Sequence, residues 1–157
     1  MIKIISYPKR IFDYMVKNKK YTPGDSFISI GYSFIAEDDE SVLPSNERCI
    51  RVLFDDVIDD AEFPTIGGEV TKVHVISSKQ AQDLLIFGLA ANSNSTIHIH
   101  CFAGQSRSVA VAQGLEYAFK QVNIPCDIRH TKIDITPNSA VLSAMHKELF
   151  LLPTLNL

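Results

Sequence analysis

The sequence is poor in cysteine and has no excess of basic residues. Its 157 residues include three cysteines, Cys49, Cys101 and Cys126, which are too few for a disulfide framework and fit no zinc-ribbon spacing. The formal net charge of -3 argues against a strongly basic nucleic-acid-binding protein and against a polybasic membrane anchor. This charge still allows a phosphate ligand, because backbone donors and one arginine are enough to bind it.

Long hydrophobic runs are also missing. The longest stretch without Asp, Glu, Lys or Arg, residues 84–106, has Asn, Ser and Thr at its middle, which a bilayer span would not tolerate. Lys3, Pro8 and the pair Lys9 and Arg10 interrupt the apolar start, so no secretory signal is predicted. We therefore expect a cytoplasmic protein that has no membrane partner.

The chain has no repeats and no low-complexity tract, and its length suits one domain covering residues 1–157. Short apolar segments predict strands at 2–7, 26–32, 49–54, 70–76 and 96–100. Helices are predicted at 9–18, 77–91, 107–121 and 137–150, with a capping box formed by Ser77 and Gln80. Residues 37–46 are predicted to form an acidic loop and residues 57–68 a surface loop.

Strands that alternate with helices in this way predict an α/β fold, with a mainly parallel central sheet flanked by helices. In such sheets, ligands bind at the carboxyl ends of the strands. The strand that ends near His100 and the apolar helix that begins at Arg107 therefore enclose the segment of greatest interest.

This segment places a cysteine, a glycine and an arginine in a short turn between a strand and a helix. Gly104 allows a tight turn, and the N-terminus of the helix adds positive potential to the inward-facing backbone N–H groups. The planar guanidinium of Arg107 is suited to binding two phosphate oxygens at once. The same field favours the thiolate form of Cys101, which would attack phosphorus and form a phosphocysteine.

His100, Cys101, Gly104, Arg107 and Ser108 resemble the signature of cysteine-dependent protein phosphatases, in which His-Cys is followed by five residues, Arg, and Ser or Thr. The chain length resembles the dual-specificity branch. The runs HCFAGQSRSVAVA and VLFDDV resemble the small bacterial and phage tyrosine-phosphatase-like proteins. The resemblance covers about residues 50–149 and implies a phosphotyrosine protein phosphatase-like fold.

The resemblance also implies a role for each matching residue. Cys101 would be the nucleophile, Arg107 would bind the phosphoryl group, and Ser108 would assist departure of the cysteine sulfur. His100 would orient the loop from behind. The phosphoryl oxygens would be bound by the loop amides of Phe102, Ala103, Gly104, Gln105, Ser106 and Arg107.

Such phosphatases also need an aspartic acid that protonates the leaving group and then deprotonates the attacking water. The resemblance favours Asp56, because the small bacterial proteins show Asn-Asp-Ile or Asp-Asp-Ile at this place in the VLFDDV segment, and Asp55 is the second candidate. The interval from Asp56 to Cys101 is longer than is usual in the dual-specificity branch, so Asp59 and Asp60 remain alternatives.

The sequence therefore predicts a metal-independent phosphatase without a cofactor, acting on a phosphorylated protein or peptide. Phosphotyrosine is the favoured target, with phosphoserine and phosphothreonine as further targets. A polyphosphoinositide or RNA substrate fits less well, because the loop carries no lysine to balance extra phosphate charge.

Three alternatives compete with this prediction. A phosphopeptide-binding module would result if no aspartate reached the leaving group. A rhodanese-like sulfurtransferase also places a cysteine loop between strand and helix. His98, His100 and Cys101 could suggest a metal site, but no fourth ligand stands at a suitable spacing.

Overall fold

The computed structural model describes residues 1–34 and 42–152 of the chain. Along the sequence, these residues form β1 (Ile2–Pro8), α1 (Lys9–Lys17), β2 (Ser26–Gly31), β3 (Arg48–Leu53), β4 (Ala61–Pro64), β5 (Val70–Val73), α2 (Ser78–Leu89), β6 (Thr96–Cys101), α3 (Arg107–Gln121), β7 (Cys126–His130) and α4 (Ser139–Leu151). Part of the predicted acidic loop at 37–46 lies outside the described residues.

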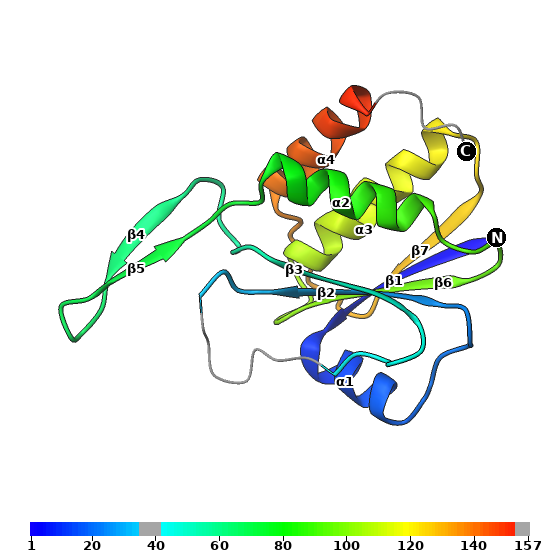
Figure 1. Ribbon diagram of the computed structural model, residues 1–157, viewed down its shortest axis with the longest axis horizontal. Coiled ribbons are helices and arrows are strands. Elements are labelled where there is room, and N and C mark those ends of the chain that lie inside the picture. Colours follow the sequence, from blue (N-terminus) through cyan, green and yellow to red (C-terminus); the bar gives the residue numbers. More distant parts are fainter. Residues whose placement is uncertain (35–41, 153–157) are drawn as a thin grey trace.

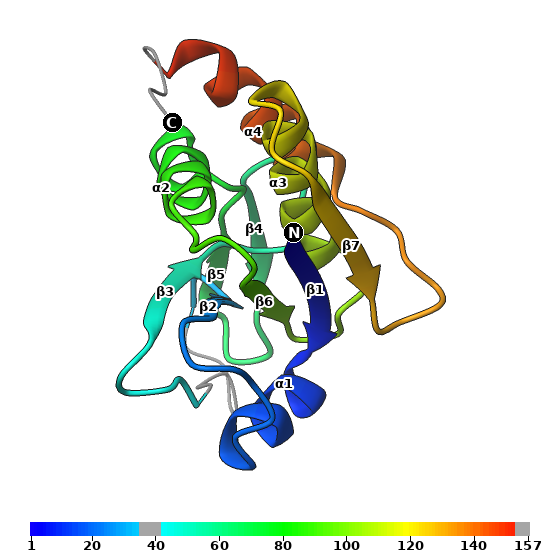
Figure 2. The same cartoon turned by 90° about the vertical axis from the view of Figure 1, so that its right-hand side faces the viewer.

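Five strands form the central sheet in the order β3-β2-β6-β1-β7, and all four neighbouring pairs are parallel. Helices α2, α3 and α4 cover one face of this sheet and α1 covers the other (Figures 1 and 2). The predicted α/β fold with a mainly parallel sheet flanked by helices is confirmed. Because the strands are parallel, their carboxyl ends meet at one edge, where β6 leads into α3.

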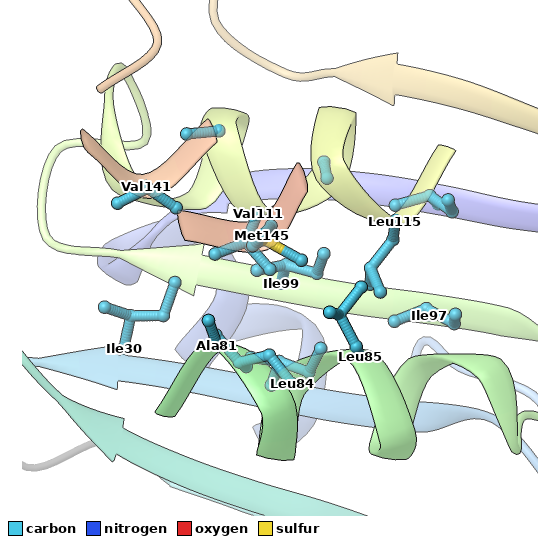
Figure 3. Packing of buried hydrophobic residues seen from close by; sticks show 14 of the residues in the cluster. Ile30, Ala81, Leu84, Leu85, Ile97, Ile99, Val111, Leu115, Val141 and Met145 are labelled. Carbon is cyan, nitrogen blue, oxygen red and sulfur yellow. The ribbon is translucent and has the colours of Figure 1, made fainter. Parts of the chain in front are cut away.

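The alternation of side chains along β6 divides the interior into two apolar clusters. Ile97 and Ile99 point toward α2, α3 and α4, where they pack with Leu85 and Leu115 (Figure 3). The residues between them, His98 and His100, face α1 on the opposite side of the sheet, beside Phe27 and Phe12 respectively. Cys101 faces the same side of the sheet as Ile97 and Ile99, and it ends the strand against the larger cluster.

The predicted helices and strands are observed within three residues at each end, and the capping box of Ser77 and Gln80 is present. Two predictions need correction. Residues 57–68 are not only a loop, because Ala61–Pro64 pairs antiparallel with Val70–Val73 as a two-stranded hairpin. The edge strand Cys126–His130 was not among the predicted strands, because its alternate residues are exposed and its apolar signal is short.

The four helices in the described part of the chain are all too short or too polar to cross a membrane.

Candidate active site

The turn from β6 into α3 is shaped by Gly104. Its φ of 72° lies in the left-handed region, and a Cβ added there would stand 2.4 Å from the backbone nitrogen of Pro8. The glycine therefore allows the loop to pack directly on the end of β1, rather than making room for a ligand. The Lys9 N–H donates to the Phe102 carbonyl over 3.0 Å and holds the loop from the same side.

Cys101 lies at the floor of this loop, with 2% of its surface exposed. Its Sγ accepts a hydrogen bond from the Gly104 N–H over 3.2 Å and lies 3.2 Å from the Ser108 hydroxyl. The Cys101 sulfur therefore lies where a backbone N–H of the loop and a side-chain hydroxyl of α3 converge.

Arg107, the first residue of α3, is 3% exposed and turns its guanidinium inward. Its Nη1 donates to the carbonyl of Phe54 at 2.8 Å and to that of Gly31 at 3.3 Å, while the guanidinium carbon lies 4.5 Å from the centre of the Tyr32 ring. Nε and Nη2 have no acceptor among the described residues. In that part of the chain, every side-chain nitrogen that is fully buried has a hydrogen-bond partner. Because Nε and Nη2 have none, they are not fully buried, and they remain available to an anion in the cavity that Arg107 lines.

A cavity of about 400 Å³, here called the site cavity, joins these groups. Its walls come from the loop after β6 and from three other segments: Tyr32, Asp56, Cys101, Ala103, Gln105, Ser106, Arg107, Asp134 and Thr136. Of the predicted loop residues, Phe102 and Gly104 do not line it. Phe102 is half-exposed beside Tyr32, with the ring centres 6.3 Å apart.

His100 supports the loop from the α1 side of the sheet. Burial lowers the pKa of His100 to about 4, against the opposing effect of its hydrogen bond to the Cys101 carbonyl. The neutral ring donates from Nδ1 to that carbonyl at 3.1 Å and accepts at Nε2 from the Ser29 hydroxyl at 2.7 Å. Because Arg51 in turn donates to the Ser29 oxygen, the tautomer of His100 is fixed.

Asp56 is the aspartate candidate that reaches the site cavity. Its Oδ1 accepts from the Ser106 hydroxyl at 2.6 Å and from the Asn138 side-chain amide at 2.8 Å. Both contacts hold one oxygen of the carboxylate, while Oδ2 has no partner among the described residues. The carboxylate is therefore oriented and still has an oxygen available for proton transfer.

The other three candidate aspartates lie elsewhere. Asp55 is buried and accepts from the Ser33 backbone N–H and hydroxyl and from the His74 N–H, so it joins the end of β2 to the end of β5. Asp59 and Asp60 line a second cavity beside the hairpin, and Asp60 accepts from the Val75 N–H at 2.9 Å. The geometry favours Asp56 over all three.

Sequence reasoning missed Tyr32 and Asp134, and it considered Asn138 at the start of the last helix without its hydrogen bond to Asp56. Tyr32 follows directly after β2, so the rule that ligands bind at carboxyl ends of strands could have indicated it. Asp134 accepts from the Gln105 side chain at 2.7 Å and lies in the segment after β7, a strand that was itself not predicted. Nothing in the local sequence connects Asn138 with Asp56.

His98 has partners that account for its burial. It donates from Nε2 to Asp25 at 2.9 Å and accepts at Nδ1 from the Tyr7 hydroxyl at 2.9 Å. Burial, and then the nearby Asp25 charge, raise the pKa of Tyr7 to about 12. Across residues 1–34 and 42–152, no group of three or more His, Cys, Asp or Glu side chains is arranged to hold a metal ion.

Comparisons with models of known protein families, with curated proteins and with solved structures find no match for this chain. The functional argument therefore depends on the geometry of the site cavity and on the spacing of its residues.

Proposed function

We propose that this protein hydrolyses phosphomonoesters through a phosphocysteine intermediate, with phosphotyrosine in a protein or peptide as its favoured substrate. The observation that carries the proposal is the convergence of Cys101, Arg107 and Asp56 on one cavity at the N-terminus of α3. A nucleophile, an anion-binding guanidinium and a proton donor are the three groups that this reaction requires.

In the first step, the Cys101 thiolate attacks phosphorus while the bond from phosphorus to the leaving oxygen breaks. The free nitrogens of Arg107 and the backbone N–H groups of the loop bind the phosphoryl oxygens, where negative charge is concentrated. Asp56, protonated at Oδ2, donates its proton to the departing phenolate oxygen. The products are the free tyrosine side chain and phosphocysteine.

In the second step, a water molecule attacks the phosphocysteine and gives a proton to the Asp56 carboxylate. The sulfur–phosphorus bond breaks and inorganic phosphate leaves. The Ser108 hydroxyl, 3.2 Å from Sγ, stabilises the departing thiolate by donating a hydrogen bond to it.

The aromatic rim beside the site cavity supports an aryl phosphate as substrate. Tyr32 lines the cavity and stacks on Phe34 with ring centres 5.2 Å apart, and the Phe102 ring centre lies 6.3 Å from that of Tyr32. Flat apolar faces contact a phenyl ring over more area than a serine or threonine side chain. We therefore expect phosphotyrosine to be cleaved faster than phosphoserine or phosphothreonine.

Hydrolysis of para-nitrophenyl phosphate in the presence of EDTA tests the proposal. The wild-type protein should turn over this substrate, and Cys101→Ser should lower kcat by at least about 10³-fold, because a hydroxyl is a much weaker nucleophile at this pH. Cys49→Ser and Cys126→Ser are matched controls that should retain turnover. Neither Cys49 nor Cys126 lines the site cavity.

Three outcomes would contradict the proposal. Turnover that survives Cys101→Ser would place the chemistry elsewhere. Tight phosphopeptide binding without any turnover would identify a binding module. Thiocyanate formation from thiosulfate and cyanide, without phosphate release, would identify a sulfurtransferase.

A further inference from the structure

A second cavity adjoins the site cavity on the side of the β4–β5 hairpin. This hairpin cavity has a volume of about 550 Å³ and shares Asp56, Ser106 and Thr136 with the site cavity. Its other walls are mainly apolar groups from the segment that leads into β4 and from the segment before α4, and they include Val57, Ile58, Ala61 and Pro137. A chain bound with one residue in the site cavity would therefore pass directly over the hairpin cavity.

The hairpin itself presents apolar side chains to solvent. β4 and β5 pair only with each other within the described residues, and they project from the molecule at the end where β6 leads into α3 (Figure 1). Ile58 is 67% exposed and Phe63 is 53% exposed. Phe63 lies two positions beyond Ala61, so the two side chains share one face of β4.

The same segment carries a strong negative charge. Residues 52–73 include six carboxylates and one basic residue, Lys72, which lies opposite Glu62 across the hairpin. Asp55 is buried, but the others are exposed: Asp56, Asp59, Asp60, Glu62 and Glu69. An apolar surface bordered by carboxylates attracts a partner that is apolar and basic, and it repels an acidic one.

We infer that the hairpin cavity and the β4–β5 hairpin bind the residues of a substrate polypeptide that flank its phosphorylated residue. An apolar side chain of the polypeptide fills the hairpin cavity beside Ile58, and a neighbouring lysine or arginine lies against the carboxylates of Asp59 and Asp60, which line that cavity. This inference rests on the proposed function, because the phosphorylated residue in the site cavity sets the register of the chain. It adds a preferred sequence to that function, namely apolar and basic residues beside the phosphotyrosine.

Binding of two phosphotyrosyl peptides to the Cys101→Ser variant tests the inference. One peptide carries leucine and lysine beside the phosphotyrosine, and the other carries serine in place of the leucine. Fluorescence anisotropy should show that the first binds about 10-fold more tightly, the ratio expected from one additional buried apolar side chain. Adding Ile58→Ser and Phe63→Ser should remove most of this ratio, whereas adding Ile86→Ser, which replaces a similarly exposed isoleucine on α2, should preserve it.

The charged part of the surface is tested separately. Asp59→Asn together with Asp60→Asn should weaken binding of the leucine–lysine peptide at low salt and reduce the salt dependence of its Kd. Equal affinity for the two peptides, or a ratio that survives Ile58→Ser and Phe63→Ser, would overturn the inference.

Turnover of para-nitrophenyl phosphate keeps this result distinct from the proposed function. That small substrate occupies the site cavity alone, so Ile58→Ser and Phe63→Ser should leave its kcat/KM unchanged while they lower kcat/KM for the leucine–lysine peptide. Cys101-dependent turnover with no peptide preference would leave the proposed function standing and reject only the docking surface. Peptide preference without turnover would support the docking surface and reject the proposed function.

Discussion

The 101–107 loop and the β4–β5 hairpin lie beside each other at one end of the molecule, and they are held in opposite ways. The loop is fixed on every side: β1 packs under Gly104, His100 bonds to the Cys101 carbonyl, and the carbonyls of Gly31 and Phe54 hold Arg107. The hairpin strands pair only with each other among the described residues, and most of their side chains are exposed.

This difference separates two requirements of a phosphatase that acts on polypeptides. Bond breaking needs groups held within a fraction of an ångström, which requires packing and hydrogen bonds around each of them. Recognition of flanking residues tolerates an adaptable surface. Substitutions in the loop should therefore affect turnover and folding strongly, and equivalent substitutions in the hairpin should affect them weakly.

Substitutions at the adjacent residues Asp55 and Asp56 should separate an effect on stability from an effect on turnover most clearly. Asp56→Asn should lower kcat by about 10³-fold, because the amide cannot transfer a proton, while its oxygen still accepts from Ser106 and Asn138. Asp55→Asn should instead destabilise the fold by about 2 kcal/mol, because one of its two acceptor oxygens becomes a donor facing other donors. Steady-state kinetics and urea unfolding of both variants measure the two effects. Near-wild-type turnover by a folded Asp56→Asn variant would remove this residue from the mechanism.

A pair of glycines compares the loop and the hairpin at matched backbone angles. Gly104 has φ 72° with no room for a side chain, whereas Gly68, in the hairpin turn, has φ 81° with open space around it. Gly104→Ala should cost about 3 to 4 kcal/mol of unfolding free energy, from backbone strain together with the contact against Pro8. Gly68→Ala should cost only about 1 kcal/mol, since backbone strain acts alone. Equal losses in urea unfolding would show that the loop is not held as tightly against β1 as described.

The pH dependence of stability gives the smallest of the three effects. The pKa of His100 is about 4 in the folded protein and 6.5 ordinarily, so between these values the unfolded chain binds a proton that the folded protein does not. Stability should therefore be complete above pH 6.5 and should fall by up to about 3 kcal/mol as the pH drops to 4. His100→Asn should reduce this slope in urea unfolding at a series of pH values, although His98, whose pKa burial also lowers, contributes to what remains.

Most of the fold and the centre of the candidate site could be predicted from the sequence because their signals are local. Cys101, Gly104, Arg107 and Ser108 lie within eight consecutive positions, and the capping box of α2 spans four. Asp56 could be favoured over Asp59 and Asp60 because the VLFDDV segment that contains it resembles the matching segment of the small bacterial proteins.

The features that were missed depend on contacts between distant parts of the chain. Tyr32 and Asp134 reach Arg107 and Gln105 because the sheet places β2 next to β6 and brings the segment after β7 to the same edge. The hairpin was not predicted, because the segment contains acidic residues, Pro64 and two glycines, which are typical of a loop. These residues gave no indication that Ala61–Pro64 pairs with Val70–Val73. Strand order and cross-strand pairing of this kind cannot be predicted from any single short segment of the sequence.

The position of β6 as the middle strand has a consequence for how the protein opens. Two strands lie on each side of it, so fraying that begins at the outer strands β3 or β7 reaches β6 last. In native-state hydrogen exchange, the amides of β6 should be among the slowest to exchange, while those of β4 and β5 exchange early. The sulfur of Cys101, the proposed nucleophile, is thus attached to the part of the protein that persists longest during partial unfolding.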